Sequence, residues 1–152
     1  MNNTTLTLKM KRAISELRSG GKVVISDNSF GTSVLLMSAE LIEKESVNKL
    51  SDLALSRPNI ILSNNRCNAI GIEVSNQPCS ILIENNWTIN DILSLCMPLT
   101  GHETPTINGV ILENNTSIIS YCLLILRQSR LLPAGLMLSL IHISEPTRPL
   151  II

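Results

Sequence analysis

The residues best suited to chemistry lie in a short polar stretch, Thr100-Gly101-His102-Glu103. A histidine next to a carboxylate can bind a metal ion or transfer a proton. Zinc, however, requires three or four protein ligands, and one carboxylate neighbour does not complete such a site. A single short motif is also a weak predictor of function. The default interpretation of His102 is therefore a solvated loop residue.

The four cysteines are Cys67, Cys79, Cys96 and Cys122. None are spaced as the C-x-x-C pair that is typical of redox or zinc sites. Two disulfides are possible, but the polar N-terminus has no signal peptide that would direct the chain to an oxidising compartment. We expect buried, reduced thiols that behave as small apolar side chains. Arg66 and Cys67 suggest no catalysis, and Cys67 is expected to pack a short helix against a sheet.

Consecutive glycines, Gly20-Gly21, are a helix stop rather than a phosphate-binding loop, because no helix begins directly after them. They follow an amphipathic segment, Leu8–Ser19, whose apolar residues repeat at helical spacing: Met10, Ala13, Ile14 and Leu17. Gly20 is expected to take the left-handed conformation past the helix end. Consecutive β-branched residues in Lys22–Ile25 predict a strand covered on both faces. A polar loop, Ser26–Ser33, is expected next.

Predicted helices and strands alternate along the rest of the chain, which favours an α/β fold with a layered sheet and flanking helices. The expected strands are Val34–Met37, Asn59–Leu62, Cys79–Ile83, Val110–Leu112 and one that follows Leu131–Met137. The expected helices are one opened by Glu43 and stopped by Pro58, a short one capped by Asn64 and ending near Ile70, Asp91–Met97 capped by Thr88 or Asn90, and Ile118–Gln128.

Composition narrows the class of protein. The 152 residues suit one domain, and with 44% apolar residues but one Trp, one Tyr and one Phe the core must be aliphatic. Lys+Arg and Asp+Glu are 12 each, so no basic excess suggests a nucleic-acid partner. No window reaches the roughly 18 apolar residues of a membrane span. We expect a cytoplasmic protein that binds neither nucleic acid nor membrane.

The last residues of the chain do not resemble the sequence of a natural protein. Leu138–Arg148, LSLIHISEPTR, matches the in-frame translation of a transposon-end sequencing adapter, and Pro149–Ile152 would be index-encoded. We therefore expect a domain at residues 1–137, an artefact tail at residues 138–152, and a natural chain that continues past Met137. His142 then carries no functional weight. The alternative is a genuine apolar C-terminal strand with a proline-containing tail.

The beginning of the chain resembles dihydroxybutanone phosphate synthase, an enzyme of riboflavin biosynthesis. In that family a first strand leads into an acidic loop, D-D-E-D-R-E-N-E-G-D-L, and then a strand ending A-A-E. Here Val23–Asp27 and Ser38-Ala39-Glu40 match the two strands, but residues 28–33 between them have no acid and no Arg. In the family that the chain resembles, this loop binds the magnesium ions and the substrate. Asp27 alone cannot supply such a site, because hard cations need several oxygen ligands.

A second family signature, R-x-G-H-T-E-A followed by a helix and P-A-G, is matched at its end by Pro133-Ala134-Gly135. Ser117-Ile118-Ile119-Ser120 stands where G-H-T-E should be, so the metal-binding His and its acid are missing. Thr100–Glu103 imitates the Gly-His pair but lies too far upstream. Asp27 and Glu40 are the carboxylates left at inherited positions, and we expect packing or turn roles for both. The alternative is a residual weak magnesium contact.

This pattern resembles the degenerate synthase-like domain fused ahead of GTP cyclohydrolase II in some bacterial proteins. The resemblance covers Arg12 to about Ile72 and, briefly, Leu131–Met137. It implies a non-catalytic structural or dimerisation domain, a homodimer, and a C-terminal catalytic module in cis, whose zinc-binding cysteine cluster this chain lacks. We expect no catalytic, cofactor-binding or metal-binding residue and no cofactor. The alternative is a divergent active synthase acting on ribulose 5-phosphate.

Overall fold

The computed structural model describes residues 3–27, 31–42, 58–73, 76–98, 101–107, 110–111, 117–140 and 150–151. The helices are α1 (Asn3–Arg18), α3 (Asn64–Ala69), α4 (Ile89–Cys96) and α5 (Ser117–Gln128). The strands are β1 (Val23–Asp27), β2 (Thr32–Ser38), β3 (Asn59–Leu62), β4 (Cys79–Leu82), β5 (Val110–Ile111), β6 (Ala134–Ser139) and β7 (Leu150–Ile151). The helix predicted after Glu43, the centre of the loop after Asp27, and His142 lie outside the described residues.

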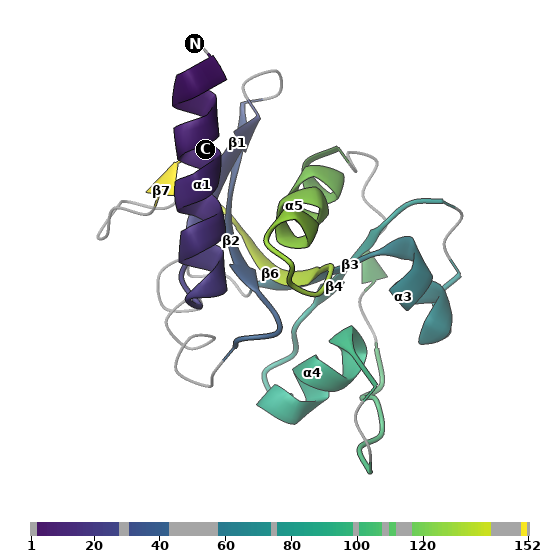
Figure 1. Cartoon of the computed structure of the whole chain (residues 1–152). Helices are drawn as coiled ribbons and strands as arrows, with labels where there is room; N and C mark the ends of the chain where they lie inside the picture. Colours follow the sequence, from purple (N-terminus) through teal and green to yellow (C-terminus); the bar gives the residue numbers. More distant parts are fainter. Residues whose placement is uncertain are drawn as a thin grey trace.

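Within the described residues, seven strands form one sheet in the order β5-β4-β3-β6-β2-β1-β7 (Figure 1). Neighbouring strands are antiparallel except β1 and β7, which are parallel. Strand β6 is therefore central although it comes late in the chain. It joins the β1–β2 pair to the β3–β4 pair. The predicted α/β fold with a layered sheet and flanking helices is confirmed.

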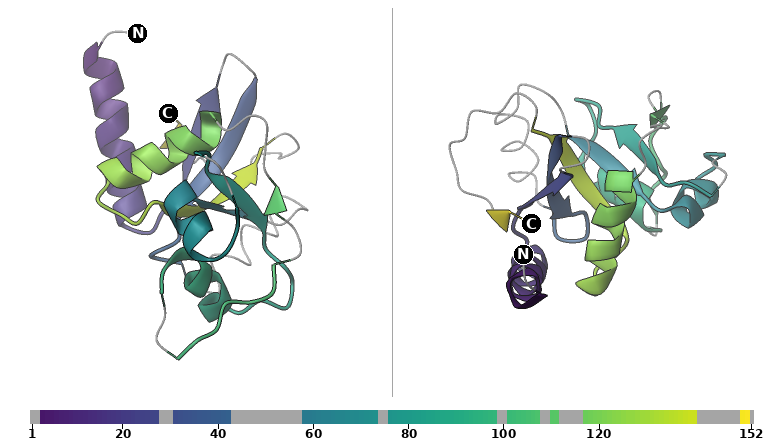
Figure 2. Two further views of the ribbon diagram at one scale, coloured as in Figure 1. Left: turned by 90° about the vertical axis from the view of Figure 1, so that its right-hand side faces the viewer. Right: turned by 90° about the horizontal axis from the view of Figure 1, so that it is seen from above.

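The two faces of the sheet are covered by different helices. Val23 and Ile25 of β1 belong to one buried cluster, which includes apolar residues of α1 and α5. Val24 belongs to the other cluster, which includes residues of α3 and α4. The view from above in Figure 2 shows α1 and α5 on the same side of the sheet. Side chains alternate between faces along a strand, so the consecutive β-branched residues are buried on both sides as predicted.

The hairpin between β1 and β2 is longer than the sequence suggested. The polar loop predicted over Ser26–Ser33 is wrong at its ends, since β1 continues to Asp27 and β2 begins at Thr32. Ser26 pairs with Ser33 across the two strands, and their hydroxyl oxygens lie 2.9 Å apart. This hydrogen bond satisfies two polar side chains within the sheet, so their polarity does not end the strands.

Helix ends follow capping rules, with one correction. Gly20 has a φ of 85°, the left-handed conformation predicted after the first helix. Thr88 caps α4 as expected, and its hydroxyl accepts a hydrogen bond from the Asp91 N–H at 3.1 Å. The cap predicted at Asn64 is wrong. Ser63 is the N-cap of α3, and its hydroxyl accepts from the Arg66 N–H at 3.3 Å.

Gly135, within the Pro-Ala-Gly match, lies where helix α5 meets the sheet. A Cβ atom at this position would come within 2.9 Å of the Met37 carbonyl oxygen, 3.0 Å of Leu36 Cδ1 and 3.1 Å of Leu126 Cδ1. Because one of these neighbours is backbone, the site cannot adjust without moving β2. The glycine lets α5 approach β6 closely.

The expected artefact tail, residues 138–152, begins within strand β6. Leu138 and Ser139 are the last residues of β6 and pair with Leu35 and Val34 of β2. Leu138 is 2% exposed. Leu150–Ile151 pairs with β1. These residues of the tail are therefore paired in the sheet at both places.

A helix must be long and apolar to cross a membrane, so the described helices can be compared with the expectation that the chain does not enter one. Helix α1 has 16 residues. Within the described residues, no helix has both the length and the apolar character needed to cross a bilayer.

Candidate functional site

The two carboxylates that match the synthase motifs, Asp27 and Glu40, lie at opposite ends of the β1–β2 hairpin. Asp27 is paired with Thr32 at the start of β2, whereas Glu40 follows the end of β2 at Ser38. At a rise of about 3.3 Å per residue, the ends of β2 are roughly 20 Å apart. The backbone positions of Asp27 and Glu40 are therefore far apart compared with the length of a carboxylate side chain.

Glu40 has a structural role of the kind expected. Its Oε2 accepts a hydrogen bond from the Leu132 N–H at 3.3 Å, and its own N–H donates to Ser38 Oγ at 3.1 Å. These contacts tie the end of β2 to the segment that leads into β6. In the described part of the chain, no three His, Cys, Asp or Glu side chains are grouped so that they could hold a metal ion.

The positions aligned with G-H-T-E form the first turn of α5. Ile118 is 5% exposed and Ile119 is fully buried, and both belong to the cluster beneath α5. Ser120 is exposed on the opposite side. This turn therefore anchors the helix through its apolar side chains, which is the packing role expected from the sequence.

His102 is held by a specific partner. Its Nε2 lies 2.9 Å from Asp91 Oδ1, and the His102 and Asp91 side chains are 30% and 22% exposed. His102 lies in a loop as expected, and Asp91 is a partner that the sequence did not indicate. A carboxylate beside an imidazole can hold it in one orientation, as in acid–base sites. Here it connects the segment at residues 101–107 to the start of α4.

Asp91 also completes the N-terminal cap of α4. Its Oδ2 accepts a hydrogen bond from the Thr88 N–H at 2.8 Å, which forms a capping box with the Thr88 hydroxyl. This backbone hydrogen bond lowers the pKa of Asp91, and His102 acts in the same direction while partial burial opposes them. The sequence pattern Thr-x-x-Asp gave a signal for the cap, but nothing local pointed to His102.

Replacing Asp91 with alanine is expected to lower the free energy of unfolding by about 1 kcal/mol at pH 6. Because folding lowers the pKa of this carboxyl, its contribution is present above the unfolded pKa of about 4 and is lost as the pH falls through the folded value. The difference between variant and wild type should shrink in urea unfolding at pH 3. Glu103→Gln, at an exposed acid, is the control and should have little effect at either pH. An equal loss at both pH values would contradict the prediction.

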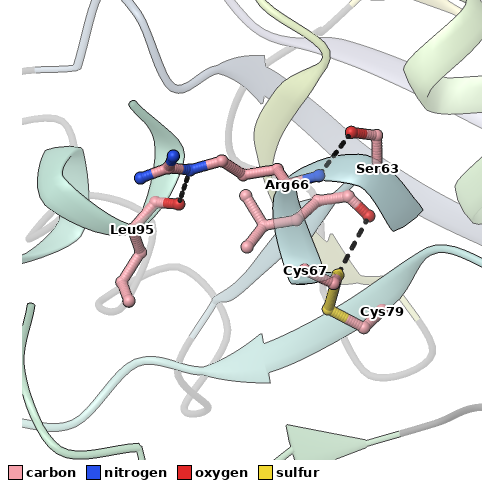
Figure 3. Close-up of a disulfide and its surroundings, with 6 residues drawn as sticks. Ser63, Arg66, Cys67, Cys79 and Leu95 are labelled. Atoms are coloured by element: carbon pink, nitrogen blue, oxygen red, sulfur yellow. Dashed lines mark hydrogen bonds between the residues drawn. A yellow bond between two sulfur atoms is a disulfide. The ribbon is translucent and has the colours of Figure 1, made fainter. Parts of the chain in front are cut away.

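Cysteine pairing differs from the sequence expectation. Cys67 and Cys79 form a disulfide, with their Cα atoms 6.8 Å apart (Figure 3). Cys96 and Cys122 are free and buried, as expected, and burial raises the pKa of each thiol to about 12. The pairing arises because Cys79 lies opposite Leu62 at the end of β3, and α3 begins two residues later. The spacing of the cysteines along the sequence does not by itself indicate that Cys67 pairs with Cys79.

Arg66 connects two helices that are distant in sequence. Its Nε donates to the Leu95 carbonyl oxygen and its Nη2 to the Ser94 carbonyl oxygen, both at 2.9 Å. Carbonyl groups in the last turn of a helix lack partners within the helix and favour a cation. Arg66 therefore caps the C-terminal end of α4 from α3. The sequence indicated no role for this residue.

The fold is similar to that of known proteins whose structures have been solved. No protein-family model and no curated protein matches the chain. A solved structure that does match is RibBX, a two-domain 3,4-dihydroxy-2-butanone 4-phosphate synthase from A. baumannii, with a TM-score of 0.62 and 14% identity over 93% of this chain and 49% of that one. Another is 3,4-dihydroxy-2-butanone 4-phosphate synthase of Candida albicans, with a TM-score of 0.63 and 18% identity over 84% and 77% of the two chains. The fold is that of these synthases.

The synthase fold agrees with the resemblance seen in the sequence. The chain spans 49% of the A. baumannii synthase, about half of its length. Identities of 14% and 18% describe shared architecture rather than shared chemistry. On this fold, Asp27 and Glu40 lie at opposite ends of β2, and isoleucines occupy the first turn of α5.

Proposed function

We propose that this chain is a non-catalytic structural or dimerisation domain of a GTP cyclohydrolase II-type protein of riboflavin biosynthesis. The observation that carries the proposal is the separation of Asp27 from Glu40 by the length of β2. A synthase fold whose two motif-matched carboxylates stand at opposite ends of one strand keeps the scaffold without the metal chemistry. The alternative is a divergent active synthase acting on ribulose 5-phosphate, which the synthase fold itself leaves open.

The decisive experiment is an assay of the purified chain with ribulose 5-phosphate and magnesium, with formate as the readout. We expect no formate above a blank without protein, while an active synthase assayed in parallel releases it. Formate release that disappears in Asp27→Asn would establish the alternative function. Release that is unchanged in Asp27→Asn would indicate a contaminating enzyme.

The proposed parent protein includes a catalytic module that follows this domain. The A. baumannii synthase is described as a two-domain protein, so this fold occurs joined to a second domain. We propose that residues 138–152 are adapter-derived and that the natural residues after Met137 complete β6. Reading the source DNA tests this directly. Codons that spell the adapter support the proposal, and a genomic locus that encodes this tail and a stop codon contradicts it.

The proposed homodimer would form through the helices on one face of the sheet. Tyr121 and Leu124, one turn apart on α5, are 41% and 48% exposed, and Leu8 on α1 is 52% exposed. Sedimentation at micromolar concentration should show a dimer that Leu124→Glu disrupts. Leu82→Glu, at a residue on β4 that is 38% exposed, should not disrupt it. A wild-type chain that sediments as a monomer contradicts the dimer.

A further inference from the structure

We propose that Cys67 and Cys79 act as a reversible redox clasp that controls how firmly α3, and through Arg66 the end of α4, are held on the sheet. The clasp is the disulfide between these two cysteines. This inference concerns the regulation of stability and is independent of the proposed function.

The position of the disulfide suits such a role. Cys79 begins β4 and lies opposite Leu62, the last residue of β3, while Cys67 lies on the helix that follows β3. The bond therefore fastens α3 to β4, the strand that pairs with β3, as Figure 3 shows. It joins residues with a sequence separation of 12. A crosslink of this kind stabilises chiefly by restricting the unfolded segment.

Helix α3 is the element that depends most on this bond. It has six residues, and helices of that length are not stable without tertiary contacts. Its buried residue is Cys67 itself, while Asn65, Asn68 and Ala69 are exposed. Because α3 contributes so little apolar surface to the core, breaking the crosslink removes a large share of what holds it.

Arg66 transmits the effect to α4. It is the residue next to Cys67, and its guanidinium donates to the carbonyl oxygens of Leu95 and Ser94 at 2.9 Å. Long polar side chains lose these bonds when their backbone becomes mobile. Loosening α3 would therefore leave the last turn of α4 without its cap and allow it to fray.

The chemistry is a two-electron thiol–disulfide exchange with a dithiol reductant. A thiolate of the reductant attacks one sulfur to form a mixed disulfide, and its second thiol then displaces that sulfur. The products are the Cys67 and Cys79 thiols and the oxidised, cyclic reductant, which supplies two electrons and two protons. Both protein sulfurs are buried, so the attack requires local opening of α3. Cys96 and Cys122 are free and buried, and neither is paired with another cysteine in this structure.

The test begins with thiol counting on the intact chain after mild oxidation. Alkylation in denaturant should label two of the four cysteines, and all four after treatment with dithiothreitol. Hydrogen exchange is then compared in the oxidised and reduced protein. Reduction should accelerate exchange of the α3 amides, and of those in the last turn of α4, by roughly tenfold or more, while α1 on the opposite face is unchanged.

Two variants separate the parts of the proposal. In Arg66→Met the last turn of α4 should exchange quickly in both redox states, whereas α3 still responds to reduction. Cys122→Ala, which removes a buried thiol from the other cluster, should keep the full redox response. The proposal of a redox clasp would be overturned if all four cysteines were labelled after oxidation. It would also be overturned if reduction did not change the hydrogen exchange of the α3 amides. A response confined to α3 in wild type would overturn the coupling through Arg66.

Discussion

Replacing Leu136 with alanine should lower the free energy of unfolding by about 3 kcal/mol. Leu136 is fully buried on the central strand β6, opposite Ile60 of β3 and Met37 of β2. Pairing on both sides holds the backbone in place, so the site cannot collapse around the missing atoms. The cost therefore includes a cavity as well as the lost burial of the side chain.

Urea unfolding at neutral pH, followed by circular dichroism, measures this loss. Leu82→Ala is the matched control because it makes the same chemical change at a residue that is 38% exposed on β4. The control should lose less than about 1 kcal/mol. Similar losses in the two variants would show that β6 is not the centre of the core.

Truncation of the chain after Met137 should lower the free energy of unfolding by at least about 2 kcal/mol, whereas truncation after Leu140 should change it little. The first cut removes Leu138 from the core and ends the pairing of β6 with Leu35 and Val34. The second cut keeps β6 and the hydrogen bond from the Leu140 N–H to the Ser33 carbonyl oxygen at 3.0 Å. It removes the two-residue strand β7.

Thermal unfolding of the two truncated chains beside the full chain provides the measurement. The sequence places the end of the domain at Met137, whereas the contacts of Leu138, Ser139 and Leu140 lead us to expect a stable unit that ends at Leu140. Equal stability of the two truncated chains would restore the original boundary. A large loss on truncation after Leu140 would instead show that β7 contributes more than two paired residues suggest.

Elements with strong local signals were predictable from the sequence. Asn59–Leu62 matches β3, and the stop at Gly20 and the cap at Thr88 are correct. In each case the determining contacts lie within a few residues, such as an apolar repeat, a glycine at a positive φ or a hydroxyl near an N–H. The scaffold of the synthase fold could also be inferred from short matches at Val23–Asp27 and Pro133–Gly135.

The side-chain connections were not predictable, because each depends on how distant segments meet. The Cys67–Cys79 disulfide requires the register of β3 and β4, and the Arg66 contacts require α3 to lie beside the end of α4. His102 and Asp91 are joined through a loop whose path has no local signature. The placement of Asp27 and Glu40 at opposite ends of β2 likewise depends on how the strands pair.

Because β6 comes late in the chain, the sheet cannot be completed until most of the chain has been synthesised. Strand β6 pairs with β2 across about one hundred residues of sequence. During synthesis, the β1–β2 and β3–β4 hairpins emerge first. The edges of β2 and β3 that pair with β6 remain unpaired until β6 leaves the ribosome. Unpaired edges are the surfaces through which nascent chains associate wrongly. A ribosome-bound chain that stops before Ala134 should therefore bind chaperones strongly, and extension past Leu140 should release them.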